Sequence, residues 1–208
     1  MKNFHLLEQF IPDAAVQRVN SLLQRHPVNI RITGRRSSKY GDFRPLPDQH
    51  FHAITINHDL NPYSFLITFL HELAHLLTWQ NHQNGVSPHG KEWKMHFKVL
   101  MHPFIEEQIF PDDVKHALMH YMSDPAASSC SSPGLIKSLR NHDKRKKGIL
   151  LDELAAGSTF KMVDNKNYLF RKGEKARKRY KCLDLNSGRE YWVSGLAEVI
   201  PIQETLGI

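Results

Sequence analysis

Cysteine is scarce in this chain, which has only Cys130 and Cys182 among its 208 residues. Neither belongs to a Cys-x-x-Cys pair, and two isolated thiols cannot form the disulfide framework of a small secreted domain. They also cannot supply the thiolates of a cysteine-rich zinc site. Any metal ion that the chain binds must therefore be held by histidine and carboxylate side chains.

A long hydrophobic run is also missing. The most apolar stretch, residues 63–77, is interrupted by His71, Glu72 and His75, so it is too short and too polar to span a membrane. The first residues, MKNFHLLEQFIPDAAVQ, lack the continuous apolar segment and the small-residue cleavage site of a secretory signal peptide. We therefore expect a cytoplasmic protein, and association with the nucleoid stays open.

The apolar content is nevertheless sufficient for a folded protein, since 40% of the residues are hydrophobic and 11 are phenylalanine. The net charge of +7 is distributed unevenly. Fifteen Lys and Arg but five Asp and Glu lie between residues 137 and 181, so this segment is more positive than the chain as a whole. The basic character therefore belongs to the C-terminal third.

Hydrophobic periodicity predicts a mixed α+β domain over residues 1–122. The expected elements are a helix at 6–25, a strand at 28–33, an irregular connection at 34–49, a strand at 51–56, and helices at 62–79, 89–100 and 114–122. Asn61 and Pro62 are typical of a helix start. The helix that follows them is apolar on nearly every side, which indicates a buried helix.

The C-terminal third has a different pattern. Residues 123–134, SDPAASSCSSPG, are mainly Ser, Ala, Pro and Gly, so we expect a linker over 123–147 that ends in a basic run. Short alternating runs then predict a small β-module of three to five strands over 148–208. Its expected core is made of the apolar residues of these runs: Phe160, Tyr168, Phe170, Tyr180, Leu183, Tyr191, Trp192 and Val199.

The sharpest pattern is His71-Glu72-Leu73-Ala74-His75, inside the helix expected to be buried. The i, i+4 spacing puts both imidazoles on one helix face, where they can hold one zinc ion. Glu72 lies beside them, placed to take a proton from a zinc-activated water that attacks a peptide carbonyl. The alternative is two core histidines and a buried carboxylate paired elsewhere, which is costly because each group would need its own partner.

A catalytic zinc site needs a third protein ligand. The candidates that follow the second histidine are His82, His89, Glu92, His96 and His102. His89 is favoured because it begins the next expected helix, in the segment SPHGKEWKMHF, where a loop can bring it back over the metal.

At these residues the sequence resembles the SprT family, which includes the Spartan-type DNA-dependent metalloproteases. The resemblance rests on HELAHLLTW and, after a polar loop, SPHGKEWKMHF; it also takes in SKYGDFR and AITINHDL, and so covers about residues 5–122. It implies a zincin-like domain with one Zn²⁺ ligated by His71, His75 and His89, and with Glu72 as the catalytic base. It also implies an endopeptidase that acts on proteins bound or crosslinked to DNA, with DNA as a partner.

The C-terminal region departs from that family, in which a four-cysteine zinc ribbon is frequent. Cys182, in the segment RYKC, resembles a residue of one remaining half-site, but Leu185 stands where a second cysteine would be needed. One thiol cannot build a structural zinc site, so we expect this degenerate, ribbon-like module to fold without metal.

Basic residues in the C-terminal third are dense enough to contact phosphate groups. The candidate DNA-contacting residues are Lys144, Arg145, Lys146, Lys147, Arg171, Lys172, Lys175, Arg177, Lys178, Arg179 and Lys181. Tyr168, Phe170 and Tyr180 are interleaved with them as candidate stacking platforms. A solvated, solubilising face is the alternative interpretation of the same charges.

Two functions of different classes follow from these patterns. The first is a zinc endopeptidase that uses Glu72 to activate water. The second is a non-catalytic nucleic-acid-binding or regulatory protein whose zinc site is structural or vestigial. Glu72 discriminates between them, because a structural site needs the histidines but not the base. Another hydrolase built on the same helix, such as an amidase, remains a third alternative.

Overall fold

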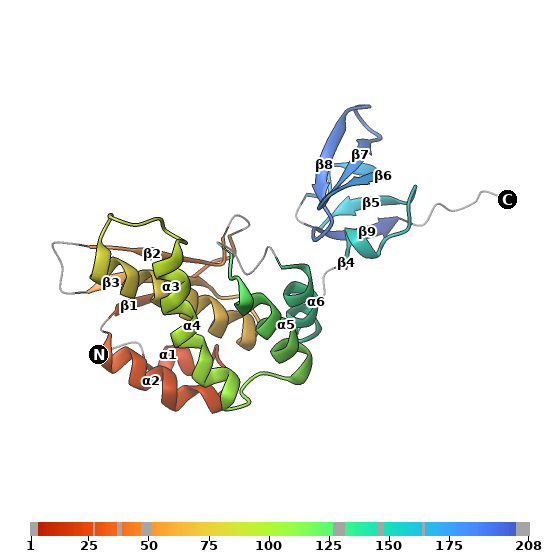
Figure 1. The fold of residues 1–208 in the computed structure, drawn as a ribbon. Helices are drawn as coiled ribbons and strands as arrows, with labels where there is room; N and C mark the ends of the chain where they lie inside the picture. Colours follow the sequence, from red (N-terminus) through yellow and green to blue (C-terminus); the bar gives the residue numbers. More distant parts are fainter. Residues whose placement is uncertain are drawn as a thin grey trace. The chain divides into compact units, whose positions relative to one another are not determined.

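The computed structural model describes residues 4–26, 28–36, 39–46, 51–126, 132–144, 148–163 and 165–202. The chain divides into two compact units, Met1–Asp143 and Lys144–Ile208, which Figure 1 shows in red to green and in cyan to blue. Among the helices of these described segments, none is long and apolar enough to cross a membrane.

The first unit combines helices with a small sheet, and the predicted mixed α+β class is confirmed. Its elements are α1 (Phe4–Glu8), a 3-10 helix (Asp13–Ala15), α2 (Val16–Arg25), β1 (Val28–Thr33), β2 (Gly41–Arg44), β3 (His52–Asn57), α3 (Pro62–His82), α4 (Lys91–Glu106), α5 (Asp112–Ser123) and α6 (Pro133–Asn141).

The sheet of the first unit has the strand order β1-β3-β2. β1 runs parallel to the central strand β3, whereas β2 runs antiparallel to it. β2 lies in the segment that was expected to be irregular. Among the residues that the structure describes, it is an edge strand of this sheet. Helix α3 packs on both β2 and β3, so this edge lies beside the most apolar helix of the chain (Figure 1).

Helix α3 begins as predicted. The side chain of Asn61 accepts a hydrogen bond from the backbone amide of Ser64 at 2.9 Å, and Pro62 is the first helical residue. Its side chains are buried on nearly every side, because α4 packs along it opposite the sheet strands. The helix ends at His82, a few residues beyond the predicted end.

The predicted helix at residues 6–25 is wrong as a single element. α1 ends at Glu8 and α2 begins at Val16, with a 3-10 turn between them. Pro12 explains the break, because it has no amide hydrogen and disfavours a helical conformation of the residue before it. Both helices still contribute to one core, in which the Phe10 and Phe65 rings stack with centroids 5.2 Å apart.

The prediction of a linker over residues 123–147 also needs correction. Residues 133–141 form α6, whose Leu135 and Leu139 are buried in the core of the first unit. The side-chain amide of Asn61 donates to the Leu139 carbonyl at 2.8 Å and to the Asp143 carboxylate at 2.7 Å. Two buried leucines at i, i+4 spacing thus hold a helix in a segment whose composition had suggested a linker. The boundary between the two units lies after Asp143. Residues 127–131 lie outside the described residues.

The second unit is an antiparallel sheet with the order β4-β9-β5-β6-β7-β8. Its elements are β4 (Ile149–Leu150), a 3-10 helix (Leu151–Glu153), β5 (Thr159–Met162), β6 (Leu169–Ala176), β7 (Arg179–Asp184), β8 (Glu190–Ser194) and β9 (Glu198–Ile202). Five strands lie close to their predicted positions, and the two-residue strand β4 makes a sixth.

The core of this sheet is smaller than predicted. Phe160, Phe170, Tyr180 and Val199 are buried as expected, together with Leu151 and Cys182. The expectation was wrong for Tyr168, Leu183, Tyr191 and Trp192, which are exposed. Side chains alternate between the two faces of a strand, so Cys182 enters the core while its neighbour Leu183 points to the other side.

Lys172 was predicted to contact DNA, and the structure contradicts this. Its side chain is 4% exposed, and its ammonium group donates to the carbonyls of Leu151 at 2.7 Å and Leu154 at 2.5 Å. The same group lies 4.0 Å from the centroid of the Tyr180 ring, and burial lowers its pKa. Lys172 therefore ties the 3-10 helix to the sheet instead of facing a ligand.

Replacing Lys172 with methionine removes the ammonium group, so the Leu151 and Leu154 carbonyls lose the hydrogen bonds that it donates. We expect Lys172→Met to destabilise the second unit by about 1–3 kcal/mol, the cost of unsatisfied buried acceptors. Urea unfolding followed by circular dichroism measures the change. Lys166→Met, at an exposed position, is the control and should change little. Equal stability of both variants would contradict the structural role of Lys172.

Gly41 lets β2 approach α3 closely. A Cβ atom at this position would lie 2.5 Å from Oε1 of Glu72 and 2.7 Å from Cγ2 of Thr68. Both of these side chains are buried and cannot simply move into solvent. The sheet edge and the helix are therefore fitted to each other at a residue without a side chain.

Gly41→Ala should push β2 and Glu72 apart. We expect a loss of about 1–3 kcal/mol in the free energy of unfolding, as for other overpacked positions. The matched control is Gly34→Ala, where the added carbon would meet nothing within 4 Å. Thermal unfolding of the two variants tests the difference, and an unchanged melting temperature for Gly41→Ala would show that the contact is not tight.

Candidate metal centre and cleft

Helix α3 carries the first part of the site. His71 and His75 lie one helical turn apart, and their Nε2 atoms approach to 3.2 Å. Both side chains leave the same face of the helix, as the i, i+4 spacing predicts. The polypeptide thus supplies two imidazole nitrogens at one point without any long-range contact.

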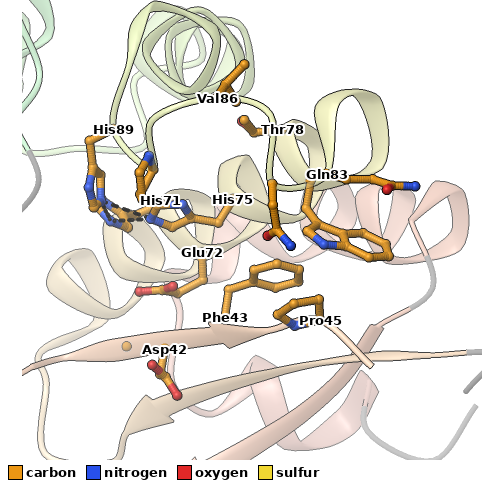
Figure 2. A pocket seen from close by; sticks show the side chains of 14 residues that line it. Asp42, Phe43, Pro45, His71, Glu72, His75, Thr78, Gln83, Val86 and His89 are labelled. Carbon is orange, nitrogen blue, oxygen red and sulfur yellow. Dashed lines mark hydrogen bonds between the residues drawn. The ribbon is translucent and has the colours of Figure 1, made fainter. Parts of the chain in front are cut away.

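His89 completes the group from the polar loop that precedes α4. Its Nε2 atom lies 3.0 Å from that of His75 and 3.3 Å from that of His71 (Figure 2). Among the described residues this cluster includes none of the other downstream candidates. His96 instead lies 3.2 Å from the side-chain amide of Asn81, and His102 is 4.0 Å from Glu106.

The three nitrogens have the spacing that a tetrahedral ion requires. Zinc bonds imidazole at about 2.0–2.1 Å, so tetrahedral angles place two nitrogen ligands about 3.3 Å apart. The observed separations of 3.0, 3.2 and 3.3 Å are close to this value. Three imidazoles that converge in this way could hold one metal ion, and the donor set fits zinc.

Buried surroundings keep the imidazoles neutral. Burial, with a smaller contribution from His89, lowers the pKa of His71 to about 3 and that of His75 to about 4. Burial lowers the pKa of His89 as well. The fully buried Trp93 lies behind all three rings, with centroid distances of 4.6, 5.4 and 4.8 Å. Neutral rings leave their nitrogen lone pairs available to a metal ion at physiological pH.

Glu72 points toward β2 beside the histidines (Figure 2). Its carboxylate accepts a hydrogen bond from the backbone amide of Phe43, which lowers its pKa. Burial acts more strongly in the opposite direction, and together with the charge of Asp42 it raises the pKa of Glu72 to about 8. A cation held by the histidines would favour the charged carboxylate and oppose this rise.

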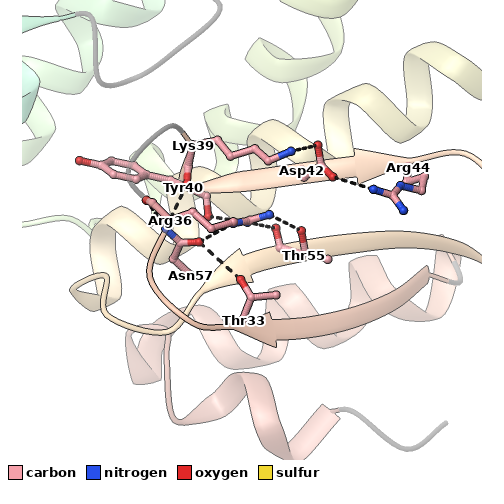
Figure 3. Close-up of polar contacts among 8 residues, drawn as sticks. All are labelled: Thr33, Arg36, Lys39, Tyr40, Asp42, Arg44, Thr55 and Asn57. Atoms are coloured by element: carbon pink, nitrogen blue, oxygen red, sulfur yellow. Dashed lines mark hydrogen bonds and ion pairs between the residues drawn. The ribbon is translucent and has the colours of Figure 1, made fainter.

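A polar network holds the chain that leads into β2. Arg36 donates from Nε to the Asn57 side chain at 2.8 Å and from one terminal nitrogen to the Thr55 hydroxyl at 3.0 Å. The amide of the buried Asn57 donates back to the carbonyls of Arg36 and Lys39 (Figure 3). These contacts fix Arg36 and the Lys39 carbonyl to the end of β3, and so place β2 next to Glu72.

The sequence pattern did not identify these positioning residues. Asp42 forms an ion pair with Lys39 at 2.8 Å and another with Arg44 at 3.9 Å (Figure 3). The available signal was the segment SKYGDFR, which contains the Gly41 and Phe43 that contact Glu72. Its role depends on a long-range fit between strand and helix.

An open cleft of about 560 Å³ leads away from the histidines. β2 and the residue after it form one side, α3 forms the base, and the loop before α4 forms the other side. The residues that line it are Gly41, Asp42, Phe43, Pro45, His71, Glu72, His75, Thr78, Trp79, Gln83, Asn84, Val86, Pro88 and His89.

The structure distributes the candidate DNA-contacting residues unevenly. Those with exposed side chains are Lys144, Arg171, Lys175, Arg177, Lys178, Arg179 and Lys181. Lys175 pairs with Asp152 at 2.7 Å, and Lys181 pairs with Glu190 at 2.7 Å, which reduces their net charge. Arg145, Lys146 and Lys147 lie outside the described residues.

The predicted stacking platforms are largely unavailable. Phe170 and Tyr180 are buried in the sheet core, while Tyr168 is exposed. Trp192, which the sequence suggested as a core residue, is 53% exposed and lies directly across from Lys181 in the sheet. A stacking residue on this unit would therefore differ from those chosen from the sequence.

Comparisons with known proteins address the first unit. A search of curated proteins found no match. The model of the SprT-like family matches residues 7–120. The matched region contains the three histidines, Glu72 and the strand that contacts it. Since it also spans more than half of the 208 residues, the chain belongs to the SprT-like family.

Proposed function

We propose that this chain is a zinc-dependent endopeptidase of the SprT type. The observation that carries the proposal is the convergence of three imidazole nitrogens beside a buried glutamate at one end of an open cleft. When bound, zinc lowers the pKa of a water ligand to about 7 and polarises a substrate carbonyl. Membership of the SprT-like family supports this metalloprotease interpretation.

The residues of the site would divide the work. His71, His75 and His89 would hold the ion through their neutral Nε2 atoms. Glu72 would take a proton from the attacking water on its carboxylate and pass it to the leaving amine. The Phe43 amide would keep that carboxylate oriented toward the cleft.

β2 supplies a further reason to expect a peptide substrate. It is an edge of the described sheet, and it pairs with β3 along one side. The free side of an edge strand presents backbone donors and acceptors that an extended peptide can match. A polypeptide paired with β2 would pass close to Glu72, because Gly41 and Phe43 both contact this side chain.

Metal content and cleavage test the site together. We expect one zinc per chain in the wild type and in Glu72→Gln, and strong loss of zinc in His89→Ala, measured by elemental analysis. Cleavage of an unfolded protein substrate should fall by several orders of magnitude in both variants, because each loses an essential group. A wild type that binds zinc but cleaves nothing, with or without DNA, would favour the non-catalytic alternative.

We further propose that the substrates are proteins bound or crosslinked to DNA, and that the basic second unit contacts the DNA. The exposed arginines Arg177 and Arg179, at the turn between β6 and β7, support this proposal. Localised positive charge favours phosphate contact, although the ion pairs of Lys175 with Asp152 and of Lys181 with Glu190 reduce the net charge available for it.

The DNA proposal predicts salt-dependent binding. Affinity for an oligonucleotide, measured by fluorescence anisotropy, should fall as salt rises, and Arg177→Ala with Arg179→Ala should weaken it and reduce the salt slope by about one per lost contact. The matched control is Lys91→Ala with Lys137→Ala, which removes two exposed charges from the first unit. An equal loss in both double variants would indicate a non-specific charge effect.

A further inference from the structure

We infer that the end of the cleft farthest from the histidines is a subsite for a bulky apolar side chain of the substrate. This inference rests on the proposed endopeptidase function and adds a sequence preference to it. The subsite would bind the side chain of a substrate residue one or two positions from the cleaved bond.

The cleft changes in character along α3. His71, Glu72 and His75 lie at one end, and Thr78 and Trp79 lie one turn further along the helix. β2 and Pro45 after it contribute apolar side chains to one side of the cleft, and the loop before α4 contributes Val86 (Figure 2). The apolar lining residues at this end are Phe43, Pro45, Trp79 and Val86, whereas Pro88 directly precedes His89.

These apolar side chains are incompletely buried. Phe43, Trp79 and Val86 each retain solvent exposure where they line the cleft. Apolar groups that surround a concave space release water when a ligand fills it, which favours an apolar ligand. The ionisable lining residues that the structure describes are Asp42, Glu72 and the three histidines, all from the metal end. An apolar side chain is therefore preferred over a charged one.

The walls of the subsite are held from behind. The ring of His52 packs against Trp79 with centroids 4.4 Å apart and against Phe43 with centroids 6.1 Å apart. Its Nδ1 atom accepts a hydrogen bond from the backbone amide of Leu46 at 3.1 Å. His52 thereby links β3, the end of β2 and α3, so the two aromatic walls need little reorganisation when a side chain enters.

The distance to the metal end fixes which substrate residue can reach the subsite. Trp79 lies four residues after His75, which corresponds to about 6 Å along the helix. An extended peptide advances about 3.3 Å per residue. A side chain one or two residues from the cleaved bond would thus lie beside Trp79 and Val86.

Matched peptides test the inference on the zinc-loaded full chain. The peptides differ at a single position, with Leu, Phe, Ala or Asp placed in turn at each of the two positions on either side of the cut. At one position Leu or Phe should raise kcat/KM about tenfold or more over Ala, with Asp lowest. A profile that is flat at all four positions would overturn the inference.

A filled subsite provides the second arm. Val86→Trp should abolish the preference for Leu or Phe while cleavage of the Ala peptide changes less. Val99→Trp, on the exposed face of α4, is the matched control and should keep the wild-type preference. A Val86→Trp variant that lowers the rates for all peptides by the same factor would contradict a side-chain-specific site.

Binding separates this inference from the proposed function. Calorimetry with zinc-loaded Glu72→Gln measures peptide affinity without turnover, and the Leu or Phe peptide should bind about tenfold tighter than its Ala counterpart. Such a preference in a protein whose wild type cleaves nothing would support the subsite and refute the endopeptidase. Equal affinities of the apolar, Ala and Asp peptides would overturn the subsite, whether or not the wild type is an enzyme.

Discussion

The burial of three ionisable side chains in the most apolar helix is the constraint on which the first unit depends. Burying an isolated polar group in such surroundings is unfavourable, so each of these side chains has a specific interaction partner. His71 and His75 meet His89 from a separate loop, and Trp93 packs behind the three rings. Glu72 receives the backbone amide of Phe43 from the sheet edge. The arrangement of β2, α3 and the loop before α4 follows from satisfying these groups together.

The second unit uses a buried charge differently. Lys172 enters the sheet core and donates to the carbonyl of Leu151 in the 3-10 helix and to that of Leu154 directly after it, so its positive charge organises the fold. Side chains alternate between the two faces along β6 and β7, which leaves Arg171 of β6 and Arg179 of β7 exposed. A count of basic residues thus overstates the charge that a partner could meet, because burial and ion pairs with Asp152 and Glu190 remove part of it.

Features set by local sequence could be predicted, whereas features set by long-range packing, apart from the approach of His89 to the two helix histidines, could not. The i, i+4 spacing of His71 and His75 and the cap formed by Asn61 depend on neighbours along one helix. Five strands of the second unit could also be predicted, because the alternation of apolar and polar residues along a strand is a local pattern. In contrast, the fit of Gly41 against α3, the inward turn of Lys172 and the docking of α6 depend on residues distant in the chain. The apolar end of the cleft is likewise assembled from three separated segments.

Asn61 joins two parts of the first unit through the two ends of one amide group. Its side-chain oxygen caps the start of α3, and its side-chain nitrogen donates hydrogen bonds to the Leu139 carbonyl and the Asp143 carboxylate. Asp143 is the last residue of this unit, so the chain enters the basic second unit directly after an atom bonded to the cap of the histidine-bearing helix. The first turn of α3 and the last residue of the first unit therefore share one side chain as a hydrogen-bond partner, although Asn61 and Asp143 are 82 residues apart in the chain. A substitution of Asn61 would disturb the start of the histidine-bearing helix and the end of the unit together.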